Sequence, residues 1–298
     1  DAAAPLEWFA ALGLYTRTDE AGRVYPYSNQ AADVLALLEG HLARLGVEVR
    51  TGCTVQTLSQ NRSGYTILCE DAEGQDQTLR ADAVICAMGG NAGPQFGTDG
   101  FGTRFAAQCG GKLEPLYPCL TALQTAKPNR SLAGIRAKAA ATLLDLDRHC
   151  TVAVENGEVQ FTDFGLSGPE AFTLSRAAAT GGDGQELALD FFREYGDSVL
   201  LDMLQEKREK LPELAAEDLF AGMLQSRLGR MIVKRAGLKY QTKLKELSDE
   251  QLLACVKTGK WFTLEVTGVM GFDSAQVTAG GAKTREFDAR TLESTKNP

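Results

Sequence analysis

Two pairs of adjacent glycines stand where bare backbone could meet a cofactor. The apolar run 83–87 predicts a buried strand, and it stops at Gly89 and Gly90. A second strand-like run ends at Gly280 and Gly281. Glycine has no Cβ, and ligands of open α/β sheets lie at the carboxyl ends of the strands. We therefore expect main chain that approaches a flat or phosphorylated group at both places, although each pair alone is also typical of a plain turn.

Two predicted helix starts carry groups that could face an anion. Arg23 precedes a helix that Ser28 could cap, and the backbone N–H groups near Ser167 are free where Pro169 opens another helix. The alternative for both is a well-capped helix that binds nothing. Asp163 lies in the second segment and is either an acid or base, or a solvated aspartate.

Several other kinds of site are disfavoured. The sequence has neither a G-x-G-x-x-G turn after an N-terminal strand nor a phosphate-binding P-loop. Only two histidines occur, His41 and His149, which argues against a histidine-based metal site and leaves few partners for a serine nucleophile. We expect no metal, and these residues alone identify no catalytic group.

One stretch, 227–245, is rich in positive charge and has no acidic residue. Its cations are Arg227, Arg230, Lys234, Arg235, Lys239, Lys243 and Lys245. Such a face could contact nucleic acid or a protein partner, but a solvated face is more common. The formal net charge of −8 also argues against a nucleic-acid protein as a whole.

Composition is that of an ordinary globular protein. The 298 residues are 44% hydrophobic and 23% charged, enough for two or three domains with a sizeable core. No apolar run approaches the ~18 residues that a membrane span needs. Seven cysteines without a C-x-x-C pair predict reduced thiols, most of them buried, in a cytoplasmic protein. Because the chain starts at Asp1 and stops without a closing element, we expect that both ends were cut.

The pattern up to Gly111 is mixed. It predicts a helix from Ser28 to about Leu45 that ends at Gly46, strands over 47–50, 65–69 and 78–80, the buried strand 83–87, and a helix from about Asp99 through Cys109 that ends at Gly110 and Gly111. From 112 to 192 the pattern is β. It predicts strands over 134–144 and 187–191 and a tight hairpin turn at Asn156-Gly157.

The stretch 198–257 is helical. Pro212 should open one helix, and Ser248 with Gln251 forms a capping box for another. Residues 261–267 return to a strand pattern. The helical stretch therefore looks inserted between strands of one β domain.

Six segments together resemble, in order, the motifs of a known family. They are 22–28 (GRVYPYS), 81–90 (ADAVICAMGG), 97–100 (GTDG), 161–169 (FTDFGLSGP), 277–281 (VTAGG) and 291–294 (TLES). The family is the bacterial FAD-dependent oxidoreductases of the BaiN and aminoacetone-oxidase-like type. Met88 departs from its usual threonine, and Asp163 from its frequent histidine.

The resemblance implies an α/β plus β fold in three parts. A partial FAD-binding domain, Rossmann-like and of the glutathione-reductase type, would hold 1–111 and 282–298. A β-barrel-like domain would hold 112–192 and 258–281, and a helical insertion 193–257. By the same resemblance, the positions that would line FAD are Arg23, Ser28, Val55, Ala87, Met88, Gly89, Gly90, Gly280 and Gly281.

The implied activity is that of an FAD-dependent oxidoreductase. NAD(P)H would reduce the flavin, and a small organic substrate or dioxygen would reoxidise it. The family's opening glycine-rich loop and its closing flavin-contacting segment are missing from these residues, so we expect a middle portion that is inactive alone and holds no FAD. We expect neither a membrane nor a nucleic-acid partner. The alternative is a non-enzymatic binding module that uses 227–245.

Overall fold

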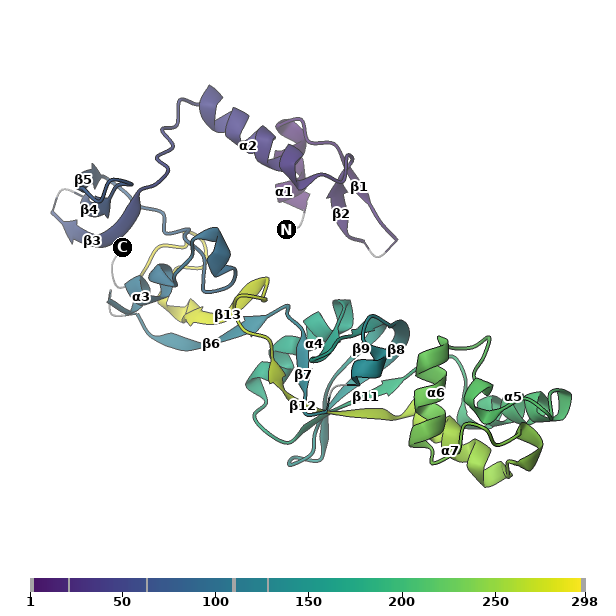
Figure 1. Ribbon diagram of the computed structural model, residues 1–298. Helices are drawn as coiled ribbons and strands as arrows, with labels where there is room; N and C mark the ends of the chain where they lie inside the picture. Colours follow the sequence, from purple (N-terminus) through teal and green to yellow (C-terminus); the bar gives the residue numbers. More distant parts are fainter. Residues whose placement is uncertain (1–2, 21, 63, 109–110, 128, 296–298) are drawn as a thin grey trace. The chain divides into compact units, whose positions relative to one another are not determined.

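Two compact units make up the chain, one up to Ile85 and one from Cys86 onward. The structure is a computed structural model that describes residues 3–20, 22–62, 64–108, 111–127 and 129–295 (Figure 1). The predicted end of a helix at Cys109 and Gly110 lies outside the described residues.

The described residues of the first unit form two small antiparallel sheets and two helices. Its elements are α1 (Ala3–Ala11), β1 (Thr16–Thr18), β2 (Val24–Pro26), α2 (Ala31–Arg44), β3 (Thr54–Asn61), β4 (Gly64–Glu70) and β5 (Asp76–Ala81). Strands β1 and β2 pair with each other, and β3, β4 and β5 form a three-stranded sheet in that order. The predicted strands at 65–69 and 78–80 are confirmed, and so is the helix stop at Gly46, whose φ is +70°.

Two predicted strands are wrong: 47–50 in the first unit and 83–87, which spans the division between the units in the sequence. Residues 47–50 and 83–87 form no ladder with any described strand. Both segments are largely exposed, and Ile85 reaches 91%. An apolar alternation favours a strand, but a strand persists only where another backbone satisfies its N–H and C=O groups. The helix start is shifted as well, because Gln30 rather than Ser28 occupies the N-cap position of α2.

The second unit is built around a closed six-stranded barrel with strand order β10-β7-β12-β11-β8-β9. Its strands are β7 (Leu123–Thr125), β8 (Arg136–Asp145), β9 (Cys150–Phe161), β10 (Gly165–Ser167), β11 (Gln185–Asp190) and β12 (Phe262–Val269). All of its ladders are antiparallel. Alternation puts Ala139, Ala141 and Leu143 of β8 into the core. The predicted strands at 134–144, 187–191 and 261–267 are thus confirmed within a residue or two at each end.

The predicted hairpin at Asn156-Gly157 is wrong. Both residues lie inside the continuous strand β9, where Asn156 pairs with Ala140 and Gly157 with Ala139. Gly157 instead leaves room for a side chain of a neighbouring helix, because a Cβ there would lie 1.7 Å from Oε1 of Glu170. Glu170 belongs to helix α4 (Pro169–Thr180), which opens with the predicted Pro169 and packs on β9.

Helices at the end of the barrel share its core. They are α5 (Asp197–Lys210), α6 (Ser226–Arg235) and α7 (Asp249–Lys260), joined by the short 3-10 turns η3 (Ala216–Asp218) and η4 (Leu244–Glu246). Leu200, Ile232 and Val256 belong to the same buried cluster as the barrel residues Leu189 and Phe262. The capping box of Ser248 and Gln251 at the start of α7 is confirmed.

No helix starts at Pro212, contrary to the prediction. Residues 212–215 instead run beside 243–245, where Ala215 bridges Lys243 and the Lys245 N–H donates to the Pro212 carbonyl. Backbone groups used in such a bridge are not available for a helical turn.

A two-stranded ribbon of β6 (Leu113–Cys119) and β13 (Val277–Ala282) completes the second unit, with helix α3 (Phe101–Gln108) against it. The remaining 3-10 turns are η1 (Pro94–Phe96), η2 (Arg130–Leu132) and η5 (Thr284–Glu286). No helix in the described part of the chain is long and apolar enough to cross a bilayer.

Candidate functional site

Thr278 of β13 joins the two glycine pairs that the sequence singled out. Its hydroxyl oxygen accepts hydrogen bonds from the backbone N–H groups of Asn91 at 2.8 Å and Ala92 at 2.9 Å, across 187 and 186 positions of sequence. The Thr98 hydroxyl donates to the Gly90 carbonyl. The loop that carries Gly89 and Gly90 is therefore held against the strand that carries Gly280 and Gly281.

Two of these four glycines are explained by contacts within the protein. A Cβ on Gly90 would lie 2.6 Å from Oγ1 of Thr278, and a Cβ on Gly280 would lie 1.9 Å from the Pro115 carbonyl oxygen. Gly280 also sits in the β-bulge where β13 changes register against β6. At these two positions the missing side chain lets protein pack on protein.

Gly89 and Gly281 are different. Both have positive φ, +73° and +108°, and a Cβ built on either would meet nothing within 4 Å. Their conformation favours glycine, and their backbone faces open space. Of the four predicted glycines, these two present bare main chain to a possible ligand.

Gly281 lines a hollow of about 360 Å³ at the end of the ribbon, together with Glu114, Gly280, Ala282, Lys283, Thr284 and Arg285. The Lys283 ammonium lies 2.7 Å from a Glu114 carboxylate oxygen, so one cation of the hollow is neutralised. No described carboxylate pairs with Arg285. The hollow therefore offers bare backbone at Gly281 and one cation, Arg285, that no described carboxylate neutralises.

Ala87 and Met88 lead into the loop and are both exposed, Met88 to 39%. A Cβ on Gly102 of α3 would lie 2.9 Å from Cγ of Met88, so this glycine leaves room for the Met88 side chain. The sequence identified Met88 only as a departure from a motif, and the signal for its neighbour Gly102 was missed.

Three other predicted site residues belong to the first unit. The Arg23 guanidinium and backbone N–H both bind Asp19 at 2.8 Å, and this bond raises the pKa of Arg23. The Ser28 hydroxyl accepts from the Gln30 N–H at 3.3 Å. Val55 pairs with Cys69 in the sheet of β3 and β4. Their predicted roles toward FAD stay predictions.

The segment 161–169 forms a strand and a helix start, as predicted. Ser167 pairs with Gln160 in the barrel, and Gly168 is the N-cap of α4 with φ +103°. Asp163 lies in the turn before β10 and forms no ion pair with another described residue. The buried group here is Glu170, which sequence reading missed because its neighbour Gly157 was assigned to a turn.

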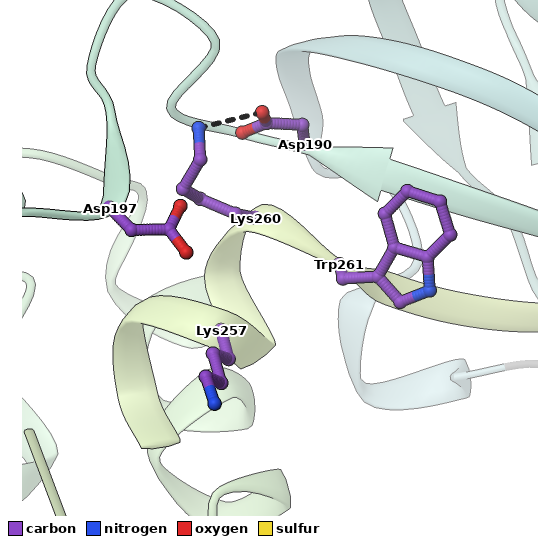
Figure 2. Close-up of a pocket in the computed structure, with 5 residues that line it drawn as sticks. All are labelled: Asp190, Asp197, Lys257, Lys260 and Trp261. Carbon is purple, nitrogen blue, oxygen red and sulfur yellow. Dashed lines mark hydrogen bonds and ion pairs between the residues drawn. The ribbon is translucent and has the colours of Figure 1, made fainter. Parts of the chain in front are cut away.

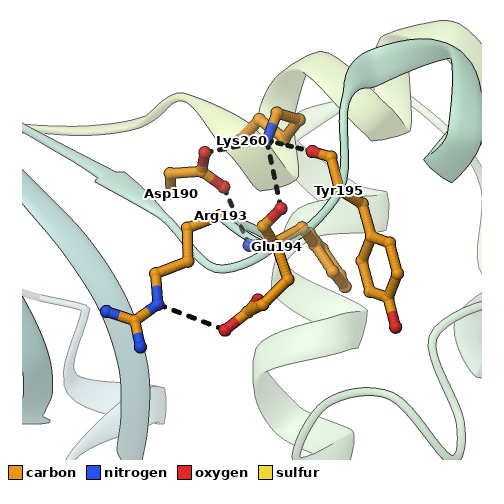
Figure 3. Close-up of polar contacts among 6 residues, drawn as sticks. Asp190, Arg193, Glu194, Tyr195 and Lys260 are labelled. Carbon is orange, nitrogen blue, oxygen red and sulfur yellow. Dashed lines mark hydrogen bonds and ion pairs between the residues drawn. The ribbon is translucent and has the colours of Figure 1, made fainter.

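A second hollow, of about 430 Å³, lies where the barrel meets α5 and α7 and is lined by Asp190, Asp197, Lys257, Lys260 and Trp261 (Figure 2). All three N–H donors of the Lys260 ammonium in this hollow have an acceptor. Its ammonium donates to Asp190 Oδ2 at 2.8 Å and to the carbonyls of Phe192 at 3.1 Å and Tyr195 at 2.8 Å (Figure 3). These bonds tie the turn after β11 to the last turn of α7. We therefore assign this cluster to structure and place the candidate site at the ribbon.

Metal ligands do not gather anywhere in the parts of the chain that the structure describes, since no three of the histidine, cysteine, aspartate and glutamate side chains meet. Cys86 and Cys150 are exposed rather than buried.

Comparison with known proteins gives the context for the ribbon site. A family model described as the HI0933-like protein Rossmann domain matches residues 1–298. The chain belongs to the HI0933-like family. The resemblance predicted from the six motifs is thereby confirmed.

Two curated relatives bear this out. The chain is 35% identical over 293 residues to the 3-dehydro-bile acid delta(4,6)-reductase of Clostridium scindens, covering 97% of this chain and 70% of that protein. It is 26% identical over 270 residues to the ribosomal RNA dihydrouridine synthase of Escherichia coli, covering 91% of this chain and 64% of that protein. The HI0933-like chain therefore spans roughly two thirds of each relative's length.

Proposed function

We propose that the complete protein is an FAD-dependent oxidoreductase that reduces a carbon–carbon double bond next to a carbonyl. The names of both relatives describe such a reduction: one acts at the 4,6 positions of a 3-dehydro bile acid, and the other makes dihydrouridine in ribosomal RNA. The candidate substrate classes are therefore a small conjugated ketone and a pyrimidine in RNA. The observation that carries the proposal is the hydrogen bond between Asn91 and Thr278, which joins the two glycine segments across 187 positions. Gly89 of the first segment and Gly281 of the second both face open space.

The residues of the ribbon site fit a dinucleotide. In the proposal, the loop from Ala87 to Gly90 would hold the adenosine ribose and pyrophosphate, and Gly281 would leave room for the flavin ring. Arg285 would offer a charge to the anionic part. Because Gly90 and Gly280 serve packing, we assign them a supporting role: they shape the ribbon, while Gly89 and Gly281 meet the cofactor.

Bound FAD would supply the hydride chemistry, with NAD(P)H as the source of electrons and the organic substrate or dioxygen as the acceptor. The protein's part is to orient the substrate and exclude water. The proposal keeps the division into an FAD-binding part, a barrel and a helical insertion, and it places the protein in the cytoplasm.

The visible spectrum of the complete gene product tests the cofactor. We expect the absorbance of oxidised flavin, which NAD(P)H should bleach under nitrogen. A protein that shows no flavin absorbance, even after incubation with FAD, would refute the proposal.

Two glycine variants test whether FAD binds at the ribbon site. Gly281→Ala should lower the occupancy of FAD, because the new methyl group enters the space assigned to the flavin. Gly237→Ala is the matched control: it also has positive φ, +83°, and open space around a Cβ, but it lies after α6. Equal loss of FAD in both variants would mean that backbone strain, not the site, is responsible.

The alternative of a binding module that uses 227–245 without flavin has less support from the contacts of those side chains. Arg230 pairs with Glu217 and Asp218, while Lys243 and Lys245 both pair with Glu213. Three of the seven cations are therefore neutralised within the protein. Of the remaining four, Arg227, Lys234 and Arg235 belong to a different surface.

A further inference from the structure

Two stretches without acidic residues meet on the second unit. Residues 115–144 and 219–245 contain lysines and arginines but neither aspartate nor glutamate. The turn η2 of the first stretch lies against helix α6 of the second. The Arg227 guanidinium donates to the Ser131 carbonyl at 3.0 Å, and the Arg235 guanidinium lies 3.5 Å from Oδ1 of Asn129. Sequence reading treated the second stretch alone and missed this junction.

Helix α6 turns its cations outward at this junction. Leu228, Gly229, Ile232 and Val233 are its buried residues. Arg227 and Lys234 are two turns apart and share the opposite face, whereas Arg235 lies on the flank of the helix, with its guanidinium over the Phe262 ring. The apolar face of α6 packs into the core, and the opposite face of the helix is cationic.

The partners of these arginines leave their charge intact. Arg227 and Arg235 donate to neutral oxygens, the latter also to the Thr263 carbonyl at 2.8 Å, and the Arg235 guanidinium lies 3.7 Å from the centre of the Phe262 ring. Each guanidinium has five N–H donors, so several remain for a ligand while the side chain is already held in place. Arg230, by contrast, forms ion pairs with the carboxylates of Glu217 and Asp218.

Two further cations flank the junction. Lys127 and Arg130 are exposed. Within the described ranges no carboxylate lies within 4.0 Å of the charged groups of these two, or of Arg227, Lys234 and Arg235. We call these five residues the basic surface: Lys127, Arg130, Arg227, Lys234 and Arg235.

We propose that the basic surface binds the phosphate backbone of RNA. The chain as a whole has a net charge of −8 and would repel a polyanion. The five cations of the basic surface, which no described carboxylate neutralises, attract a polyanion locally. Arginine forks held by carbonyls suit phosphate oxygens, which accept two N–H bonds at once. The choice of RNA among polyanions rests on the proposed function, in which RNA is one of the two candidate substrate classes. The surface itself does not depend on flavin.

The experiment measures binding of the complete gene product to a fluorescently labelled single-stranded RNA as a function of salt. The triple variant Lys127→Gln, Arg130→Gln, Arg227→Gln should bind about tenfold or more weakly, and its salt slope should fall by about 2, since each lost phosphate contact removes ~0.7 for a single strand. The control is Arg230→Gln, Lys243→Gln, Lys245→Gln, which removes the same number of charges from carboxylate-paired positions. It should keep its affinity within about threefold, because those charges are already neutralised.

Each outcome decides the matter. Equal weakening in the two triple variants would overturn the proposal, because net charge alone would then explain binding. The proposal would also be overturned if the wild type did not bind RNA at low salt. A third contrary result would be that the first triple variant loses binding to vesicles of anionic lipid but binds RNA as well as the wild type does. If the first triple variant is unfolded by circular dichroism, the double variant Lys127→Gln, Arg130→Gln replaces it, because neither charged group is held by an ion pair to a described residue. The flavin spectrum, recorded in parallel, reports separately on the proposed reductase.

Discussion

The two units of the chain differ in how they bury apolar side chains. Among the described residues up to Ile85, Cys69 is the one hydrophobic side chain in the buried class. The other buried hydrophobics of the described residues all lie from Cys86 onward, most of them in the barrel and the helices packed on it. Large apolar side chains of the first unit face outward, including Tyr15 at 82% exposure and Ile85 at 91%.

This difference shows what a sequence pattern does and does not determine. Helix α2 carries an apolar stripe like that of α6, yet none of its residues is buried, while α6 buries four. A pattern predicts the element, but burial needs a second surface of matching shape. The second unit supplies both surfaces from its own sequence. The first unit, taken by itself, does not.

The largest expected effect is a core substitution in the barrel. Phe161 is fully buried, with ring centres 6.2 Å from Phe262 and 6.5 Å from Phe191. Phe161→Ala should lower the free energy of unfolding by about 3–5 kcal/mol, because it leaves a cavity. Tyr15→Ala, an aromatic deletion in the first unit, should change it by less than about 0.5 kcal/mol. Denaturant titration measures both. A loss at Tyr15 as large as that at Phe161 would show that the first unit buries Tyr15 against something else.

The next effect concerns the contact between β9 and α4. Gly157→Ala should destabilise by about 1–3 kcal/mol, because the new Cβ overlaps the buried Glu170 carboxylate. Glu170→Ala removes the overlapping atoms. In a double-mutant cycle, the double variant should therefore lose less stability than the sum of the two single losses. Additive losses would mean that Glu170 swings away at little cost.

Gly157 also marks the limit of what local sequence predicts. Asn-Gly is typical of a hairpin turn, but here the glycine serves the close approach of a helix that starts twelve positions later. The capping box at Ser248 and the helix start at Pro169 were predicted correctly, since each depends on residues within four positions. The strand at 83–87 was mispredicted because no described strand pairs with it. The helix at Pro212 was mispredicted because the Pro212 carbonyl bonds to Lys245, far along the chain.

The site follows the same division. Both glycine pairs were found from sequence, but the bond that joins them through Thr278 could not be, because nothing in the sequence brings 91 to 278. Nor could sequence separate glycines that serve packing from those that face open space. For the basic stretch, the charge was visible and the pairing of each cation was not.

A smaller and opposite effect is expected in α2. Gly40 lies in the helix interior, a Cβ added to it would meet nothing within 4 Å, and its φ is ordinary. Gly40→Ala should therefore stabilise α2 by about 0.5–1 kcal/mol, since alanine loses less backbone entropy in a helix. Hydrogen exchange of the α2 amides measures the gain. Slower exchange would fit a helix whose sides are open, while faster exchange would reveal a hidden neighbour against Gly40.

The smallest effect is electrostatic and again differs between the units. In the second unit, hydrogen bonds from Lys243 and Lys245 lower the pKa of Glu213 from 4.5 to about 2. Because the pKa is lower in the folded state, the stabilisation is present above pH ~4.5 and is lost as pH falls toward ~2. In the first unit, Arg50 lowers the pKa of Glu48 in the same direction, but that pair lies in the segment 47–50, which has no regular structure.

Glu213→Gln should therefore remove a small pH-dependent part of the stability, and Glu48→Gln should remove less, because ordering Glu48 constrains no other element. Denaturant titrations between pH ~5 and ~2 measure both differences from wild type. High salt should shrink the Glu213 effect, since all three charged groups are exposed. Glu213 holds 212–215 beside 243–245, so its protonation should loosen that bridge first. A difference that stays constant with pH would mean that the two lysines stabilise the bridge through their stems and not through charge.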